Sequence, residues 1–409
     1  MPHLEHVSVE GFKKIDRLAF EPGQFTVVTG RNNSGKTSLL EAVRLGADPR
    51  VVFGLGPDFS TVQHRGRDET TITVRTAEST LSQSLAVATE RTTRRVLADI
   101  VAQVWANYLS DFVDESEAEL RRELDPSARA FLDDAADQER IEAASSSVAV
   151  QLVDGEEFVY TASGESFESL SGELFEDFRH WLHDSVESNG SAFSDPDALH
   201  RALTEDDGFP MHYSHGYLAD SPEPLVTVEF EDTAPFGGQV WFGEDANETT
   251  VDDVGDFLRE RGLVDDLKTF TLDTLVFDPD DGEKYAVPFE QMGDGFETVV
   301  ALLLELLDDD LPDVVFLEEP TTHMHPGYVR EVVYFLIGLA MDEEIQLFVT
   351  THSNDFLNDL FTENLTDEEE AFLEEEFQLV QMQDGGAKLL DYRQAEESLE
   401  ELMLDLRGL

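Results

Sequence analysis

The stretch FTVVTGRNNSGKTSLLEAV, residues 25–43, does most to limit what this chain can fold into. Its β-branched and aromatic start predicts a strand over 25–29, and a helical pattern runs from Ser38 to Leu45. Between them, GRNNSGKT has the spacing G-x-x-x-x-G-K-[ST], in which N–H groups of the loop and the helix start hold phosphate oxygens. A chance glycine turn would not require this strand–loop–helix order. The stretch therefore predicts a phosphate-binding loop in an α/β protein.

The loop also predicts individual contacts to a nucleotide. Lys36 is expected to reach the β- and γ-phosphates, and the Thr37 hydroxyl is expected to hold Mg²⁺. The loop contains Arg31 and Lys36 but no acid, as a site for a triphosphate requires, because like charges repel. The candidate nucleotide ligands are Gly30, Arg31, Asn32, Asn33, Ser34, Gly35, Lys36, Thr37 and Ser38.

Two polar clusters follow apolar strands later in the chain. Residues 314–317, VVFL, predict a buried strand that ends at Glu318 and Glu319. Since ligands bind at the carboxyl ends of strands in open α/β sheets, one carboxylate can hold the metal while its neighbour polarises water. The sequence LFVTTHS places His352 at the end of another strand, where it is either a structural histidine or a contact to a γ-phosphate.

A third cluster lies at a predicted helix start. QMGDG, residues 291–295, precedes the apolar helix FETVVALLLELL. Gly293, Asp294 and Gly295 are candidates for a second anion contact, because helix N-termini attract negative charge. A plain turn from loop to helix explains the same residues.

Taken in order, five segments resemble the ABC-type ATPase heads of the RecF/SMC/OLD group, and most specifically OLD-like AAA-type ATPases. The segments are GFKKI, FTVVTGRNNSGKTSLLEAV, FEQMGDGF, VVFLEEPTTHMHP and LFVTTHSNDFL. The resemblance covers about residues 1–75 and 265–395. It implies a P-loop NTPase that binds ATP and Mg²⁺ and forms a homodimer around two ATP molecules.

The resemblance also implies roles for single residues. Gly30–Thr37 matches the Walker A loop, and Glu318 and Glu319 match the Walker B pair, with Glu319 as catalytic base and Glu318 on the metal side. Gly293–Gly295 falls where the signature motif contacts the γ-phosphate of the opposite subunit, although the usual LSGGQ-like serine is missing. His352 matches the switch histidine. Gln63 is the candidate for the Q-loop glutamine that contacts the metal.

The expected fold class is α/β: an ABC-type head with a mostly parallel sheet, antiparallel N-terminal strands and a mainly helical mid-chain insertion. The expected division is a first head segment at 1–75, an inserted lobe at 76–264 and a second head segment at 265–409. In the insertion, Val96, Ile100, Val104 and Leu109 form one helical stripe, and Pro126 after Asp125 predicts a helix start. OLD nucleases carry a C-terminal Toprim nuclease domain, which we do not expect here.

The function implied is a Mg²⁺-dependent ATPase switch in DNA repair, genome maintenance or anti-phage defence, with an effector such as a nuclease or toxin as partner. Two alternatives stay open. One is a nucleotide-sensing scaffold with little turnover, and the other is the ATP-binding subunit of an ABC transporter, against which the large insertion and the missing LSGGQ motif argue.

The net charge of the chain limits which partners it can bind. The chain has 89 Asp and Glu against 27 Lys and Arg, a net charge of −62. Such a surface repels itself unless salt screens it, so we expect a salt-loving source. Because no apolar run approaches 18 residues and the start of the sequence has no signal-peptide pattern, we also expect a cytoplasmic protein without a membrane span. DNA binding needs basic residues, and the best cluster is Arg91, Arg94 and Arg95. These arginines serve equally well as ion-pair partners for neighbouring acids.

Overall fold

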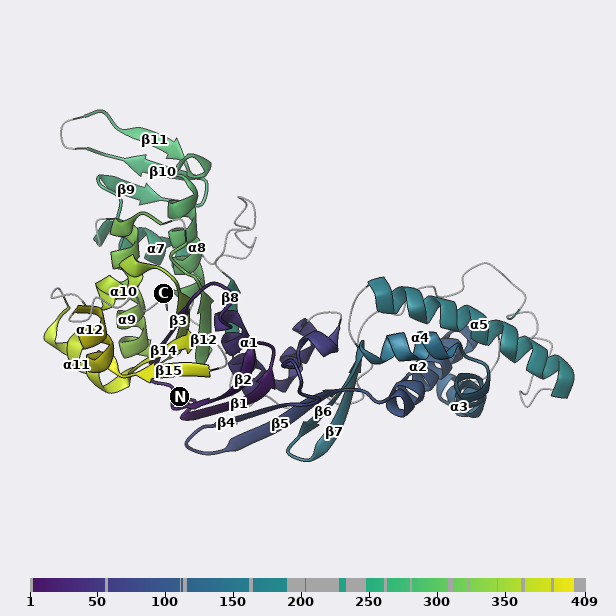
Figure 1. The fold of residues 1–409 in the computed structure, drawn as a ribbon. Helices are drawn as coiled ribbons and strands as arrows, with labels where there is room; N and C mark the ends of the chain where they lie inside the picture. Colours follow the sequence, from purple (N-terminus) through teal and green to yellow (C-terminus); the bar gives the residue numbers. More distant parts are fainter. Residues whose placement is uncertain are drawn as a thin grey trace.

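The structure is a computed structural model in which a head with a mostly parallel sheet and a helical lobe are joined by a long antiparallel sheet (Figure 1). It describes residues 3–55, 58–110, 112, 116–161, 165–189, 203, 228–232, 248–260, 263–279, 282–307, 312–322, 324–343, 345–361, 365–383 and 386–400.

The central sheet of the head has the strand order β15-β14-β3-β13-β12-β8. Neighbouring strands from β8 through β14 run parallel, and only β15 is antiparallel to its neighbour. Every residue of β3 and β13 is buried, which explains why these strands read as nearly continuous apolar runs. The strands are β3 (Phe25–Gly30), β8 (Val228–Asp232), β12 (Val314–Glu318), β13 (Gln346–Thr351), β14 (Phe377–Gln383) and β15 (Gly386–Leu390).

Different layers cover the two faces of this sheet. Val27, Leu317 and Val349 point into one core with the helices α7 to α10, whereas Val28, Phe316 and Phe348 point into a second core with α1 and a further sheet. The side chains of a strand alternate between faces, so each strand feeds both cores. The helices of the head are α1 (Lys36–Ala47), α7 (Glu248–Glu260), α8 (Asp294–Leu306), α9 (Pro326–Glu343), α10 (Asn354–Leu360), α11 (Asp367–Glu376) and α12 (Tyr392–Glu400).

The second sheet is antiparallel throughout, in the order β2-β1-β4-β5-β6-β7. Its first strands pack on α1 in the head, and its last strands lead to the helical lobe (Figure 1). The expected boundary after residue 75 lies in the turn between two paired strands, β4 and β5. Strand β8 and helix α7 also fall within the expected insertion, yet they pack in the head. The division into domains at these bounds stays a prediction. The strands are β1 (His6–Phe12), β2 (Ile15–Phe20), β4 (Thr70–Arg75), β5 (Thr80–Val87), β6 (Val148–Val153) and β7 (Glu156–Thr161).

The lobe consists of α2 (Glu90–Ser110), α3 (Glu117–Asp134), α4 (Gln138–Ser145) and α5 (Glu165–Asn189), which share a core of their own around Trp105. The indole ring of Trp105 is fully buried and lies 6.0 Å from the ring of Phe178. The predicted stripe of α2 is confirmed, since Val96, Ile100 and Leu109 are buried in this core.

The predicted helix start at Pro126 is wrong. Helix α3 begins earlier, at a capping box in which Ser116 and Glu119 bond to each other's backbone, and Pro126 lies inside the helix. A proline in a helix interior removes one backbone hydrogen bond, a local loss that the surrounding packing outweighs.

The remaining elements are small. A three-stranded antiparallel sheet of β9 (Leu267–Phe270), β10 (Thr274–Phe277) and β11 (Tyr285–Pro288) lies above α7 and α8 in Figure 1. Short 3-10 turns are η1 (Pro49–Gly54), η2 (Phe59–Thr61) and η3 (Phe289–Gln291). Within the described part of the chain, no helix is both long enough and apolar enough to cross a bilayer.

One buried glutamine joins the two sheets of the head. The Gln346 side chain accepts a hydrogen bond from Leu4 N–H at 2.9 Å, and its amide nitrogen donates to Leu4 O at 3.0 Å and to Gly23 O at 3.1 Å. Gln346 is 1% exposed, so these backbone groups have little access to water.

We expect Gln346→Leu to lower the free energy of unfolding by about 2 kcal/mol, because three backbone groups lose their partner at a buried site. Urea denaturation measures this loss. Gln383→Leu, at the exposed end of β14, is the matched control and is expected to change stability by less than about 0.5 kcal/mol. Equal stability of the two variants would contradict the role of Gln346.

Candidate functional site

The phosphate-binding loop is shaped by backbone positions with positive φ, among them Gly30, Asn33 and Gly35, and by the helix behind it. Gly30 closes β3 with φ at 146°, and a Cβ atom there would lie 2.8 Å from Met382 O. Asn33 also takes a positive φ, 65°. The loop then enters α1, whose first turn contains no acidic residue. With no acidic side chain in that turn itself, the N–H groups at this helix start favour an anion.

Lys36 lies at the centre of the loop. Its ammonium group donates to Gly30 O at 3.3 Å, and its side chain is 9% exposed. Three of the protein's six lysines lie at this one place, Lys13, Lys14 and Lys36, the others being Lys268, Lys284 and Lys388. In a chain with a net charge of −62, such clustering of lysines is unusual.

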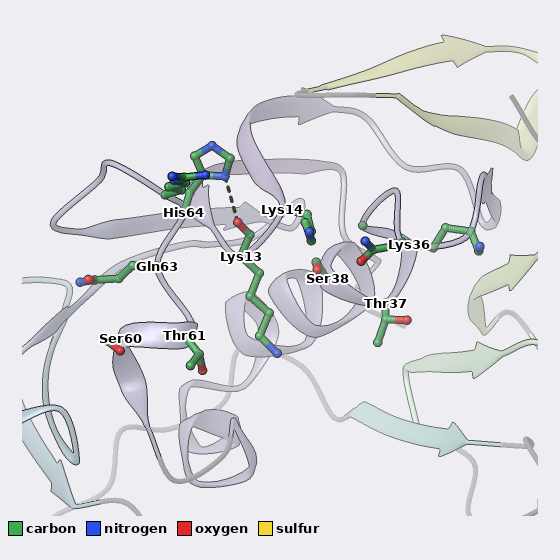
Figure 2. A pocket seen from close by; sticks show the side chains of 12 residues that line it. Lys13, Lys14, Lys36, Thr37, Ser38, Ser60, Thr61, Gln63 and His64 are labelled. Carbon is green, nitrogen blue, oxygen red and sulfur yellow. Dashed lines mark hydrogen bonds between the residues drawn. The ribbon is translucent and has the colours of Figure 1, made fainter.

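A pocket of about 980 Å³ opens beside the loop (Figure 2). The described residues that line it include Lys14, Lys36 and Arg65 but no Asp or Glu. They come from the β1–β2 turn, the phosphate-binding loop and the segment around η2, as Figure 2 shows. The lining is cationic and polar, as a site for a triphosphate requires.

The two glutamates at the end of β12, Glu318 within the strand and Glu319 directly after it, both reach the phosphate-binding loop. The Thr37 hydroxyl donates to Glu318 Oε1, and Glu319 Oε1 lies 3.7 Å from Lys36 Nζ. Thr37 and Glu318 together present hydroxyl and carboxylate oxygens, the ligand type that Mg²⁺ prefers. This donor set fits a magnesium ion at the place that the sequence predicts for it.

His352 closes the site from the end of β13. Its Nδ1 lies 2.7 Å from Glu319 Oε2, and its backbone N–H donates to the same oxygen at 3.1 Å. The imidazole side chain is 51% exposed, so it can meet a ligand that enters the site. The structure thus brings Lys36, Glu319 and His352 together from the ends of three neighbouring strands.

Two predicted contacts lie apart from this group. Gln63 lines the same pocket, but its amide nitrogen donates to Asp68 O at 2.7 Å, and its side chain points away from Thr37 in Figure 2. Glu318 and Thr37 therefore meet without Gln63. Gly293 precedes α8 and does not line the pocket in the described structure, and Asp294 and Gly295 open that helix.

Sequence reasoning missed several pocket residues. Lys13, Lys14, His64 and Arg65 line the pocket, although none contributes to the G-x-x-x-x-G-K-[ST] pattern. Lys13 is paired with Glu41 of α1 at 2.6 Å. The available signal was the pair Lys13-Lys14 itself, because adjacent lysines are rare in so acidic a chain. Their place in the fold depends on a β-turn that brings the N-terminal strands to α1.

Comparison with known protein families gives a match over most of the chain. The family model described as "AAA domain, putative AbiEii toxin, Type IV TA system" matches residues 25–358. A DNA replication and repair protein RecF from Nitrosococcus oceani is 36% identical over 64 residues, which are 15% of this chain and 16% of that protein.

Solved structures of Smc head domains also align with the chain at low similarity. The head from Pyrococcus furiosus, bound to the C-terminal domain of ScpA, has a TM-score of 0.43 and 13% identity, covering 99% of this chain and 100% of that one. The head from Thermotoga maritima has a TM-score of 0.42 and 9% identity, covering 95% and 98%. The family model, which matches well over half of the sequence, shows that the chain belongs to this AAA-domain family of P-loop ATPases.

Proposed function

We propose that this protein is a Mg²⁺-dependent ATPase that dimerises around ATP and works as a switch. The observation that carries the proposal is the convergence of Lys36, Glu319 and His352 beside the pair Thr37 and Glu318. A structural ion pair would not need a phosphate-binding loop at the same place. The family membership supports ATP as the nucleotide.

Each of these side chains has a distinct role in hydrolysis. Lys36 binds the β- and γ-phosphates and offsets their charge, while the N–H groups at the start of α1 hold the remaining oxygens. Glu319 accepts the proton of the attacking water as general base. His352 orients the Glu319 carboxylate and contacts the γ-phosphate. Thr37 and Glu318 would hold the metal ion, which would supply neutralisation of phosphate charge.

A second copy of the chain would complete the site. Gly293, Asp294 and Gly295 lie at the start of α8, where backbone N–H groups favour an anion, yet they are not part of the pocket in their own subunit. This arrangement supports a head-to-tail homodimer in which each signature-like loop reaches the ATP of its partner.

The descriptions of the matching family and of the RecF relative suggest two biological roles for the switch. The family description refers to a putative toxin of a toxin–antitoxin system, and the RecF relative is a replication and repair protein. Both roles are consistent with an ATPase in which the nucleotide state of the head is signalled through the antiparallel sheet to the helical lobe, and from there to an effector. A scaffold that senses ATP without turnover is the second candidate, and the next experiment separates the two.

Glu319→Gln is expected to lower ATP turnover by a factor of roughly 10² to 10³, while ATP binding stays at the wild-type level, because the amide keeps the shape of the side chain but accepts no proton. Phosphate release and equilibrium binding of labelled ATP measure the two quantities. Wild-type protein without turnover in any salt concentration would favour the ATP-sensing scaffold instead.

Mixing two inactive variants tests the dimer. Lys36→Ala removes the phosphate contact, and Gly295→Glu places a carboxylate where the triphosphate of the partner would lie, at a helix start that tolerates acids. Each variant alone is expected to be inactive, and a mixture is expected to regain ATPase activity through heterodimers with one intact site. A mixture that stays inactive would contradict a site shared between subunits.

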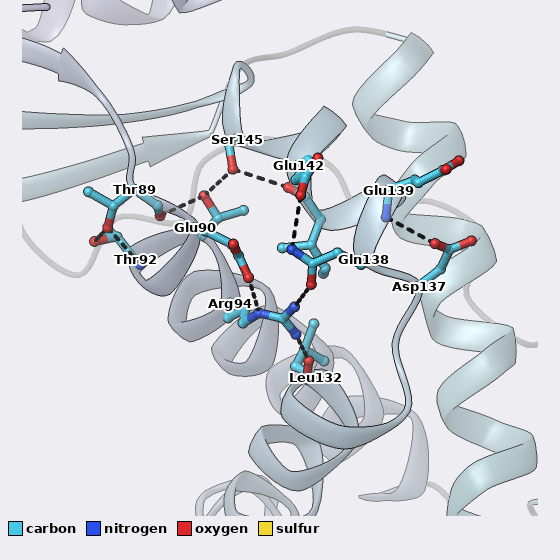
Figure 3. Close-up of polar contacts among 12 residues, drawn as sticks. Thr89, Glu90, Thr92, Arg94, Leu132, Asp137, Gln138, Glu139, Glu142 and Ser145 are labelled. Atoms are coloured by element: carbon cyan, nitrogen blue, oxygen red, sulfur yellow. Dashed lines mark hydrogen bonds and ion pairs between the residues drawn. The ribbon is translucent and has the colours of Figure 1, made fainter.

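Two arginines of the cluster make contacts within the protein, and Figure 3 shows those of Arg94. Arg94 donates to Glu90 at 3.0 Å and also to Leu132 O and Gln138, and Arg95 lies 3.0 Å from Glu157. These contacts support the ion-pair interpretation over a DNA-binding surface, because neutralised arginines contribute little to phosphate binding.

Replacing Arg91, Arg94 and Arg95 by alanine is therefore expected to leave DNA retention on filters unchanged at molar salt. The same variant is expected to melt at a lower temperature, since Arg94 loses its bonds to α3 and α4. Lost DNA retention at an unchanged melting temperature would instead identify these arginines as a DNA contact.

A further inference from the structure

Glu319 has a backbone conformation that few side chains adopt. Its φ is 52°, in the left-handed region that L residues other than glycine avoid. The preceding residue, Glu318, is still paired in register with Thr350 of β13. The chain therefore leaves the extended conformation within one residue of the sheet, and such a conformation persists only where neighbouring groups hold it.

Thr350 supplies two hydrogen-bond acceptors that hold Glu319 in this backbone conformation. The backbone N–H of Glu319 donates to Thr350 O at 3.2 Å and to Thr350 Oγ1 at 3.1 Å. The carbonyl bond would remain with any residue at position 350, whereas the second bond depends on a hydroxyl group. Thr350 is fully buried, so its hydroxyl lies in a place where an unbonded polar group is costly.

The end of β13 also holds the side-chain carboxylate of Glu319. Two residues after Thr350, His352 contacts Glu319 Oε2 through its Nδ1 at 2.7 Å and its backbone N–H at 3.1 Å. The glutamate is thus fixed at its backbone by Thr350 and at its carboxylate by His352. Lys36 Nζ lies 3.7 Å from the remaining oxygen, Oε1.

We propose that Thr350 is a positioning residue, whose hydroxyl holds the Glu319 backbone in the left-handed conformation and thereby sets where the carboxylate stands. This proposal rests on the proposed function, in which Glu319 is the general base. A base that is misplaced by a fraction of an ångström still allows ATP to bind but transfers protons more slowly. Loss of the hydroxyl should therefore lower kcat and leave KM nearly unchanged.

Thr350→Val is the direct test, because valine keeps the β-branched shape but has no hydroxyl. We expect its kcat for ATP to fall roughly tenfold with KM within about twofold of wild type. Thr350→Ser, which keeps the hydroxyl, is expected to retain kcat within about threefold. Thr350→Ala is a second variant without the hydroxyl and adds no bulk, in case valine disturbs folding.

The matched control is Thr26→Val, which removes a fully buried hydroxyl from β3 of the same sheet. That hydroxyl donates to Gly23 O at 3.1 Å, so its loss affects stability without touching Glu319. The control is expected to keep wild-type kcat. If Thr350→Val and Thr26→Val had the same kcat, or if Thr350→Ser were as slow as Thr350→Val, the positioning role would be refuted.

Glu319→Gln separates this inference from the proposed function. If Glu319→Gln is inactive and Thr350→Val is as fast as wild type, only the positioning role fails. If Glu319→Gln keeps wild-type turnover, the assignment of the base fails, and with it the role of Thr350. In the double variant we expect no loss beyond that of Glu319→Gln alone, because a positioning residue acts through the group that it positions.

Discussion

The structure depends on a carboxylate and an ammonium group meeting at the end of a buried parallel sheet. Lys36 follows β3, Glu319 follows β12 and His352 follows β13, and these three strands are neighbours. Because parallel strands end at one edge, residues that are hundreds of positions apart in the sequence are placed together by the strand order alone. Every residue of β3 and β13 is buried, so the strands that lead to that edge are packed on both faces.

The part of the site that lies on these strands could be predicted from the sequence for the same reason. Apolar runs before Gly30, Glu318 and His352 indicate strands that are buried on both sides. The residues that follow each run must therefore lie at the edge of the sheet. The resemblance to the RecF/SMC/OLD group then gave each motif an expected role. The mostly parallel sheet, the antiparallel N-terminal strands and the helical stripe of α2 are confirmed.

The other features of the site and of the fold depend on contacts that no local sequence pattern encodes. Lys14 and Arg65 reach the pocket through a turn and a loop, and Gln63 turns to a carbonyl only five residues away. Pro126 gave a wrong start for α3, since a capping box ten residues earlier decides where that helix begins. The left-handed φ of Glu319 is equally invisible in sequence, because glutamate gives no sign of such a conformation. The acidity of the chain indicates a salt-loving source, which stays a prediction, and it explains why clustered lysines stand out.

The most direct measurement of the central claim is an experimental structure of the Glu319→Gln protein with ATP and Mg²⁺. We expect the triphosphate against Lys36 and the start of α1, and the metal in contact with Thr37 and Glu318. The backbone N–H of the substituted residue should still donate to Thr350. A nucleotide bound elsewhere in the molecule, or a metal that touches neither Thr37 nor Glu318, would contradict the claim.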